Sequence, residues 1–213
     1  MEEIIKKEET NTSLNKNKGG MSALKKFFSA RRLVFIAIFI ALSYAVSFLE
    51  IPLPLFGASF LKLDFGNVFI VLVSFLLGPI EGILVCLCKE GLRCISSSSL
   101  CAGEIANFLT TSAYLLFPSI LYRYKKGLKS VLISLLISGI FATGISLACN
   151  RFIIFPVYAY LFGGSIFGMT VQEAFSLFWI GILLFNFIKT TLVGVFTILL
   201  YKRLSTFIKK LKI

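Results

Sequence analysis

The sequence predicts an all-α membrane protein of about six transmembrane helices packed in one bundle. Of the 213 residues, 57% are hydrophobic and mean hydropathy is +0.91, both above the values of a soluble domain. Apolar runs of the roughly 20 residues that cross a bilayer recur along the chain. The polar parts are too short to enclose a second core. We therefore expect a disordered, basic cytoplasmic tail at residues 1–30 and one transmembrane domain at residues 31–213.

Six apolar segments supply the predicted spans, and turn-forming residues separate them. The Gly78-Pro79 pair ends the second span, a serine run at 96–99 ends the third, and Pro156 ends the fifth. The third span is the least apolar, because it contains three charged residues. The predicted spans are Leu33–Leu49, Phe65–Ile80, Gly82–Ile95, Glu104–Tyr122, Val131–Phe155 and Ala174–Tyr201.

The distribution of the 22 Lys and Arg residues orients the predicted bundle. Eight precede residue 33, four lie in the Arg123–Lys129 link and five follow Leu200, whereas the three alternate links together hold one lysine. Basic residues accumulate on the cytoplasmic side of membrane proteins, so both termini are expected in the cytoplasm. Because these clusters flank apolar spans, they argue against nucleic-acid binding, despite a net charge of +12.

Several classes of function lack their residues in this chain. There is no histidine, which removes Ser-His-Asp and Cys-His catalytic sites and histidine-bound metals. No GxxxxGK[ST] sequence is present to bind and split ATP. Few acidic residues lie in mid-span, which weakens the case for a proton- or sodium-driven transporter. The sequence therefore indicates a membrane-embedded binding protein, not an enzyme, with no metal or cofactor of its own.

Polar side chains within the spans gather in the outer half of the predicted bundle. Lys189 lies 12 residues before Tyr201, which is about 18 Å of helix and near mid-membrane. Asn186 is one turn closer to the outside on the same helix face. A cation at this depth costs about 2.5–3.5 kcal/mol on insertion scales, so we expect this pair to contact a polar ligand. The other polar groups of this outward-open pocket are Lys62, Asp64, Glu104, Asn107, Asn150 and Arg151.

Some of these polar groups have a structural interpretation as well. Glu104 and Asn107 fit helix pairing as well as ligand contact, since an acid at a helix N-terminus is favourable in itself. In the third span, pairing within the bundle is the favoured interpretation of Lys89, Glu90 and Arg93.

Small residues form two further patterns. Ala37, Ala41 and Ala45 recur every four residues, making a smooth strip that another helix can approach, inside or outside the bundle. The five cysteines are interpreted as small apolar residues, although Cys94 and Cys101 could meet near the outer surface.

Over about residues 31–204 the chain resembles the riboflavin-specific substrate-binding (S) components of energy-coupling factor (ECF) vitamin importers. The most specific element is the Asn-x-x-Lys pair of Asn186 and Lys189. The third span departs from the usual pattern, because Lys89-Glu90 and Arg93 stand where such proteins have Lys-Asn and a later His or aromatic residue. The segments that carry the resemblance are FLKLDFGNV (60–68), LLGPIEGILV (76–85), GEIANFL (103–109), LFNFIKTTLVGV (184–195) and LLYKRL (199–204).

The resemblance implies a six-helix protein of the bacterial plasma membrane that binds riboflavin from outside. Asn150, Asn186 and Lys189 would contact the flavin ring, and the first outer link, Phe60 to Asp64, would close over it. An amide offers a donor and an acceptor side by side, as the imide edge of the flavin requires. The hydroxyls of the ribityl chain would meet Asp64, Glu104 and Asn107.

The resemblance also implies partners. A transmembrane coupling subunit would contact the Ala-x-x-x-Ala strip of Ala37, Ala41 and Ala45, and two cytoplasmic ATPases would supply energy. The alternatives are an S component for another vitamin, such as thiamin or folate, and a self-sufficient secondary transporter.

Overall fold

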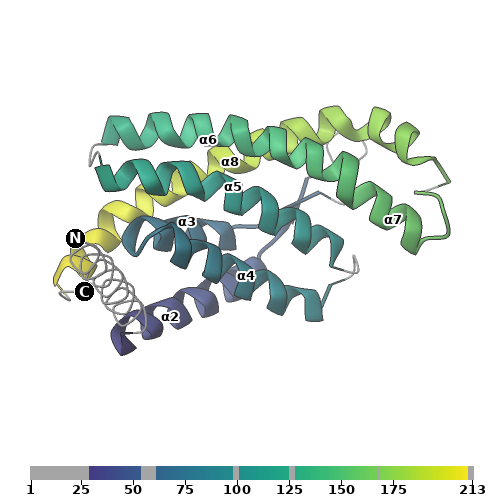
Figure 1. Cartoon of the computed structure of the whole chain (residues 1–213). Helices are drawn as coiled ribbons and strands as arrows, with labels where there is room; N and C mark the ends of the chain where they lie inside the picture. Colours follow the sequence, from purple (N-terminus) through teal and green to yellow (C-terminus); the bar gives the residue numbers. More distant parts are fainter. Residues whose placement is uncertain (1–28, 54–60, 98–100, 125–127, 167, 211–213) are drawn as a thin grey trace, which may run out of the picture.

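Helices run back and forth along one long axis, so that α2 begins and α8 ends at the same end of the bundle (Figure 1). The computed structural model describes residues 29–53, 61–97, 101–124, 128–166 and 168–210; nearly all of the predicted tail lies outside these ranges. The elements are α2 (Ala30–Ser47), β1 (Ile51–Pro52), β2 (Lys62–Leu63), α3 (Gly66–Leu76), α4 (Pro79–Ile95), α5 (Ala102–Tyr124), α6 (Leu128–Cys149), the π-helical η2 (Asn150–Ile154), α7 (Phe155–Leu161) and α8 (Val171–Lys210).

Four helical segments of the described chain are long and apolar enough to cross a membrane. They are Ala30–Ser47, Ala102–Tyr122, Lys129–Leu161 and Val171–Tyr201. Helix α3 is apolar but has 11 residues, or about 16 Å, against a hydrocarbon layer of about 30 Å. Helix α4 has 17 residues, four of them charged. The helical membrane fold is therefore confirmed, and six complete crossings stay a prediction.

The turn between α3 and α4 follows the sequence pattern. Gly78 has φ 137°, a conformation that favours glycine, and Pro79 occupies the first turn of α4, where a missing N–H costs nothing. The end of the fifth span is different. Pro156 also lies in a first helical turn, that of α7, directly after the wider π-helical turn η2. The apolar segment therefore continues to Leu161, beyond the predicted end at Phe155.

A short antiparallel hairpin, which the sequence analysis did not predict, follows α2. Ile51 pairs with Leu63 and Pro52 with Lys62, and the Leu53 N–H donates to the Leu61 carbonyl at 2.9 Å. Leu61 and Leu63 are buried at the hairpin end of the bundle against apolar side chains that include Phe155, Phe178 and Ile182. This packing fixes Asp64, the residue after β2, at the same end of the bundle.

Helix α3 lies in the centre of the bundle and touches its neighbours closely. Residues 70–73 are completely buried. A Cβ atom on Gly66 would lie 2.3 Å from the Ser43 carbonyl oxygen of α2, and one on Gly82 of α4 would lie 2.5 Å from the Ser74 Cβ. Glycine at these two positions lets α2 and α4 approach α3.

Candidate functional site

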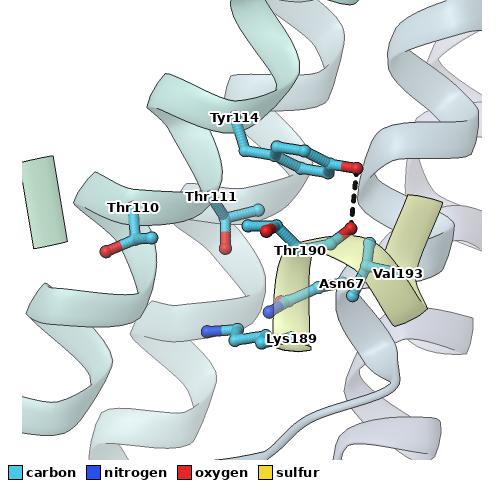
Figure 2. A pocket seen from close by; sticks show the side chains of 7 residues that line it. All are labelled: Asn67, Thr110, Thr111, Tyr114, Lys189, Thr190 and Val193. Carbon is cyan, nitrogen blue, oxygen red and sulfur yellow. Dashed lines mark hydrogen bonds between the residues drawn. The ribbon is translucent and has the colours of Figure 1, made fainter. Parts of the chain in front are cut away.

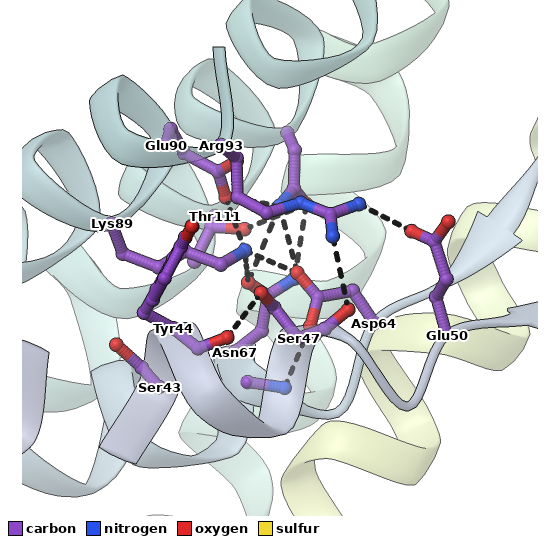
Figure 3. A network of polar contacts seen from close by, with 12 residues as sticks. Ser43, Tyr44, Ser47, Glu50, Asp64, Asn67, Lys89, Glu90, Arg93 and Thr111 are labelled. Atoms are coloured by element: carbon purple, nitrogen blue, oxygen red, sulfur yellow. Dashed lines mark hydrogen bonds and ion pairs between the residues drawn. The ribbon is translucent and has the colours of Figure 1, made fainter. Parts of the chain in front are cut away.

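A cluster of charged and amide side chains lies where the hairpin meets α3, α4, α5 and α8 (Figure 3). Lys89 of α4 is completely buried, and its ammonium pairs with Asp64 and with Glu90, the latter at 2.6 Å. The second carboxylate oxygen of Asp64 accepts the N–H of Gly66 at 2.7 Å, at the start of α3. The structure thus confirms pairing within the bundle for Lys89 and Glu90, and it uses Asp64 as the anchor of the hairpin.

Asn107 of α5 connects this acidic group to α8. Its Nδ2 donates to Glu90 and, at 3.5 Å, to Asp64. Its Oδ1 accepts from the Lys189 ammonium and, at 3.3 Å, from the Thr111 hydroxyl. Asn67 of α3 forms a reciprocal amide pair with Asn107, with distances of 2.9 and 3.3 Å. One amide on α5 therefore joins the carboxylates of Asp64 and Glu90 to the Lys189 ammonium.

Lys189 lies at the lower edge of the cluster, with 7% of its surface exposed. Among the described residues its hydrogen bond goes to a neutral amide oxygen and not to a carboxylate. Burying an ammonium is costly unless other charges compensate it. In their ionised forms, Lys89 and Lys189 together balance the two carboxylates of Asp64 and Glu90, so the cluster as a whole is neutral.

A small cavity opens beside Lys189 (Figure 2). Its volume is about 10 Å³, roughly the space that one water molecule needs. The Tyr114 hydroxyl donates across it to the Thr190 carbonyl of α8 at 2.8 Å. A ligand larger than water enters only if the side chains between α3, α5 and α8 move apart. The atoms that face the cavity are mainly apolar, although most of the residues that line it have a polar group: Asn67, Thr110, Thr111, Tyr114, Lys189, Thr190 and Val193.

The two asparagines predicted to accompany Lys189 are both buried, and each bonds to its own helix. Asn186 donates to the Ile182 carbonyl and Asn150 to the Ser146 carbonyl, both at 2.8 Å. Neither forms a hydrogen bond to Lys189 among the described contacts. Asn150 is the first residue of η2, and π-helical turns often occur at functional sites.

The remaining predicted residues that the structure describes lie nearer the hairpin end of the bundle. The Glu104 carboxylate accepts from the Ser97 hydroxyl at 2.8 Å. Lys62 is exposed and pairs with Glu50 at 2.5 Å, and Arg93 of α4 reaches the other oxygen of the same carboxylate. Phe60 lies outside the described residues. The Arg93–Glu50 pair therefore attaches the hairpin region to α4 beside the cluster, and the Lys62–Glu50 pair lies within the hairpin region.

Sequence reasoning missed Asn67, Thr110, Thr111 and Tyr114. Asn67 is the only amide in the predicted second span, and a lone amide in an apolar run is a signal that could have found it. The threonines and the tyrosine gave no signal, because such hydroxyls commonly bond within their own helix.

The alanine strip lies on the outside of the bundle. Ala37, Ala41 and Ala45 are all exposed on α2, beside exposed apolar residues such as Ile38 and Leu42. The opposite face of α2 is the one that packs inward, through Ile36, Phe39, Ser43 and Ser47.

Comparison with known proteins decides the family. A family model described as the substrate-specific component of ECF transporters matches residues 31–201. The chain belongs to this family. A solved structure, from work on the structure and mechanism of the S component of a bacterial ECF transporter, is similar to this S component with a TM-score of 0.71 and 33% identity. The match covers 84% of this chain and 98% of that one.

Two curated relatives narrow the comparison. This S component is 32% identical to the riboflavin transporter RibU of Staphylococcus aureus (strain TCH60), over 85% of its own length and 94% of RibU. It is 26% identical to the riboflavin transporter FmnP of Bacillus subtilis (strain 168), over 84% of its own length and 95% of FmnP. The resemblance found in the sequence is therefore confirmed at the level of the family.

Proposed function

We propose that this S component captures riboflavin from outside the cell and delivers it inward as part of an ECF importer. The observation that carries the proposal is the buried ammonium of Lys189, bonded to an amide oxygen and bordering a small cavity whose facing atoms are mainly apolar. Two riboflavin transporters among its relatives support this choice of ligand. A few placed polar groups within apolar walls are the usual form of a small-molecule site.

The flavin ring binds beside Lys189, in the space that the hydrogen bond between Lys189 and Asn107 closes in this structure. Three fused rings need far more than 10 Å³, so binding separates Lys189 from Asn107. The ammonium then bonds to a flavin carbonyl or ring nitrogen in place of the Asn107 oxygen. Asn186 lies one helical turn further out, where a change of rotamer turns its amide from the Ile182 carbonyl toward the imide edge. Asn150 serves the ring from η2, while Glu104, Asn107, Asp64, Lys62 and Phe60 meet the ribityl chain and the mouth of the site.

Titration of the detergent-purified chain with riboflavin, followed by quenching of flavin fluorescence, tests this proposal. A hydrogen bond to a charged group contributes about 1.5–3 kcal/mol, so Lys189→Met should weaken binding about 10- to 100-fold. Asn186→Leu should weaken it about tenfold. The matched control is Thr191→Val, on the same helix but exposed, with its hydroxyl bonded to the Phe187 carbonyl of its own helix. Unchanged affinity in Lys189→Met, with the fold intact by circular dichroism, would remove Lys189 from the site.

Delivery uses the outer face of α2. Alanines at 37, 41 and 45 leave a shallow strip along which a helix of the coupling subunit packs closely, and the exposed apolar neighbours widen the contact. Two cytoplasmic ATPases bound to that subunit supply the energy. This S component lies in the plasma membrane of a bacterium, with both termini on the cytoplasmic side.

An uptake assay in cells that contain the whole importer tests the docking face. Ala41→Trp fills the strip and should abolish riboflavin uptake, while binding by the purified chain stays unchanged. Ala148→Trp, which adds the same bulk to an exposed position of α6, should leave both activities intact. Normal uptake by Ala41→Trp would exclude this face as the docking surface.

A further inference from the structure

Two thiols meet at the outer end of the bundle, in a place that the proposed transport function does not use. Cys94 lies in the last turn of α4 and Cys101 directly precedes α5. The Cys101 Sγ lies 3.7 Å from the Cys94 carbonyl oxygen, so the side chain of Cys101 reaches back to the residue that carries the other thiol. Both residues are half-buried. By contrast, Cys86 and Cys149 are buried within the bundle.

The backbone holds Cys101 in this position. Its φ is +66°, a left-handed conformation that is uncommon for any residue except glycine. Two hydrogen bonds fix it there: the Cys101 N–H donates to the Ser97 hydroxyl at 3.3 Å, and the Cys101 carbonyl accepts the Ile105 N–H of α5 at 2.9 Å. A strained backbone conformation persists only where the surrounding contacts hold it in place. Here it directs the Cys101 side chain back toward the end of α4.

We propose that Cys94 and Cys101 form a reversible disulfide that ties the end of α4 to the start of α5. In the balanced reaction, one thiolate attacks a small-molecule disulfide such as oxidised glutathione and releases one reduced thiol. The second cysteine then attacks the mixed disulfide, closes the Cys94–Cys101 bond and releases the other thiol. The two electrons and two protons of the protein thiols thus pass to the small disulfide. The proposed orientation exposes this end to the oxidising exterior.

The position of the bond gives it a consequence for the site. Helices α4 and α5 carry Lys89, Glu90 and Asn107, and Ser97 beside Cys101 holds Glu104. A covalent tie at the outer end of these helices restricts how far they separate there when a ligand enters.

Peptide mapping of the full chain in detergent tests the proposal. After incubation with oxidised glutathione and alkylation of remaining thiols, we expect the peptides of Cys94 and Cys101 to be linked, with the loss of two hydrogen atoms and no alkyl group on either. Cys94→Ser and Cys101→Ser should each abolish the link, leaving the partner cysteine alkylated or glutathionylated. The matched control, Cys88→Ser on the same helix, should retain it.

Two results would overturn the proposal. In one, both cysteines of the wild-type chain are alkylated after oxidation. In the other, each carries its own glutathione, which would mean that the two sulfur atoms cannot reach bonding distance. The measurement uses no flavin, so its failure leaves the proposed transport function untouched.

Discussion

At the scale of single residues, the structure is governed by how it compensates buried charge. Lys89 has no exposed surface and two carboxylate partners, whereas Lys62 pairs with Glu50 at the surface, with 45% of its side chain exposed. The desolvation penalty makes the first ammonium dependent on its partners, and water largely replaces the partner of the second. The same type of ion pair therefore has very different consequences in the two places.

Lys89→Met should lower the free energy of unfolding by about 3–5 kcal/mol, because Asp64 and Glu90 would stay buried without their shared cation. Lys62→Met should lower it by about 0–1 kcal/mol. Denaturant unfolding in detergent, followed by circular dichroism, measures both. Neutralising the carboxylates as well, in Lys89→Met with Asp64→Asn and Glu90→Gln, should restore most of the loss. Equal losses of unfolding free energy in Lys89→Met and Lys62→Met would contradict the view that Lys89 compensates buried carboxylates.

Glu90 should also influence which flavin is accepted. A phosphorylated flavin brings about two negative charges to a cluster that is already neutral. Glu90→Gln leaves the cluster with one net positive charge, and at an effective dielectric constant near 20 a charge about 10 Å away contributes about 1.7 kcal/mol. The affinity for FMN relative to riboflavin should therefore rise about tenfold or more in fluorescence titrations. Glu173→Gln, at an exposed carboxylate in the first turn of α8, should not change the ratio. An unchanged ratio of the two affinities in Glu90→Gln would show that Glu90 does not discriminate between FMN and riboflavin.

At the scale of elements, hydropathy and turn chemistry predicted most of the helices. The Gly78-Pro79 turn was recognised because glycine and proline each have a conformational reason to stand there. Pro156 misled the prediction, since a proline in the first turn of a helix is indistinguishable in sequence from one that ends a helix. The hairpin could not be predicted, because two-residue strands that include Pro52 carry no periodic signal.

Some features of the candidate site could be predicted from the sequence, and others could not. The depth of Lys189 followed from counting residues along one helix. Its contact with Asn107 joins residues 82 positions apart, and no local pattern encodes such a contact. The pairing of Lys89 with Glu90 could be proposed because the two are adjacent, but Asp64 as their third member came only from the packing of the hairpin.

The contact between α3 and α4 depends on one missing Cβ atom. Gly82→Ala places that atom 2.5 Å from the Ser74 Cβ, so the helices must separate, at a cost of about 1–3 kcal/mol. Gly91→Ala, on the same helix with nothing within 4 Å, should instead stabilise by about 0.5–1 kcal/mol. Thermal unfolding in detergent measures the two opposite shifts. The double change Gly82→Ala with Ser74→Gly restores the space and should recover part of the loss. A similar shift for both alanine variants would show that the contact is not close.

At the scale of the whole molecule, the charge distribution and the topology indicate the same orientation in the membrane. The start of α2, the turn between α3 and α4, the end of α5, the start of α6 and the end of α8 lie at one end of the bundle, while the hairpin, the end of α4, the start of α5 and the end of α7 lie toward the other (Figure 1). In the sequence, 17 of the 22 basic residues precede residue 33, lie between residues 123 and 129 or follow Leu200, whereas the links predicted to lie on the other side hold Lys62 alone. This asymmetry is the basis for assigning the first end to the cytoplasm.

Labelling with a membrane-impermeant maleimide in intact cells tests that orientation. Single reporter cysteines are placed at two exposed lysines, Lys62→Cys in β2 and Lys129→Cys at the start of α6, in a chain whose Cys88, Cys94 and Cys101 are changed to serine. Because the hairpin faces outward in the proposed orientation, the cysteine at 62 should react in intact cells. The cysteine at 129 should react only after the membrane is permeabilised. The reverse pattern would place the polar cluster on the cytoplasmic side, where it could not take a vitamin from the exterior, and capture from outside would then be excluded.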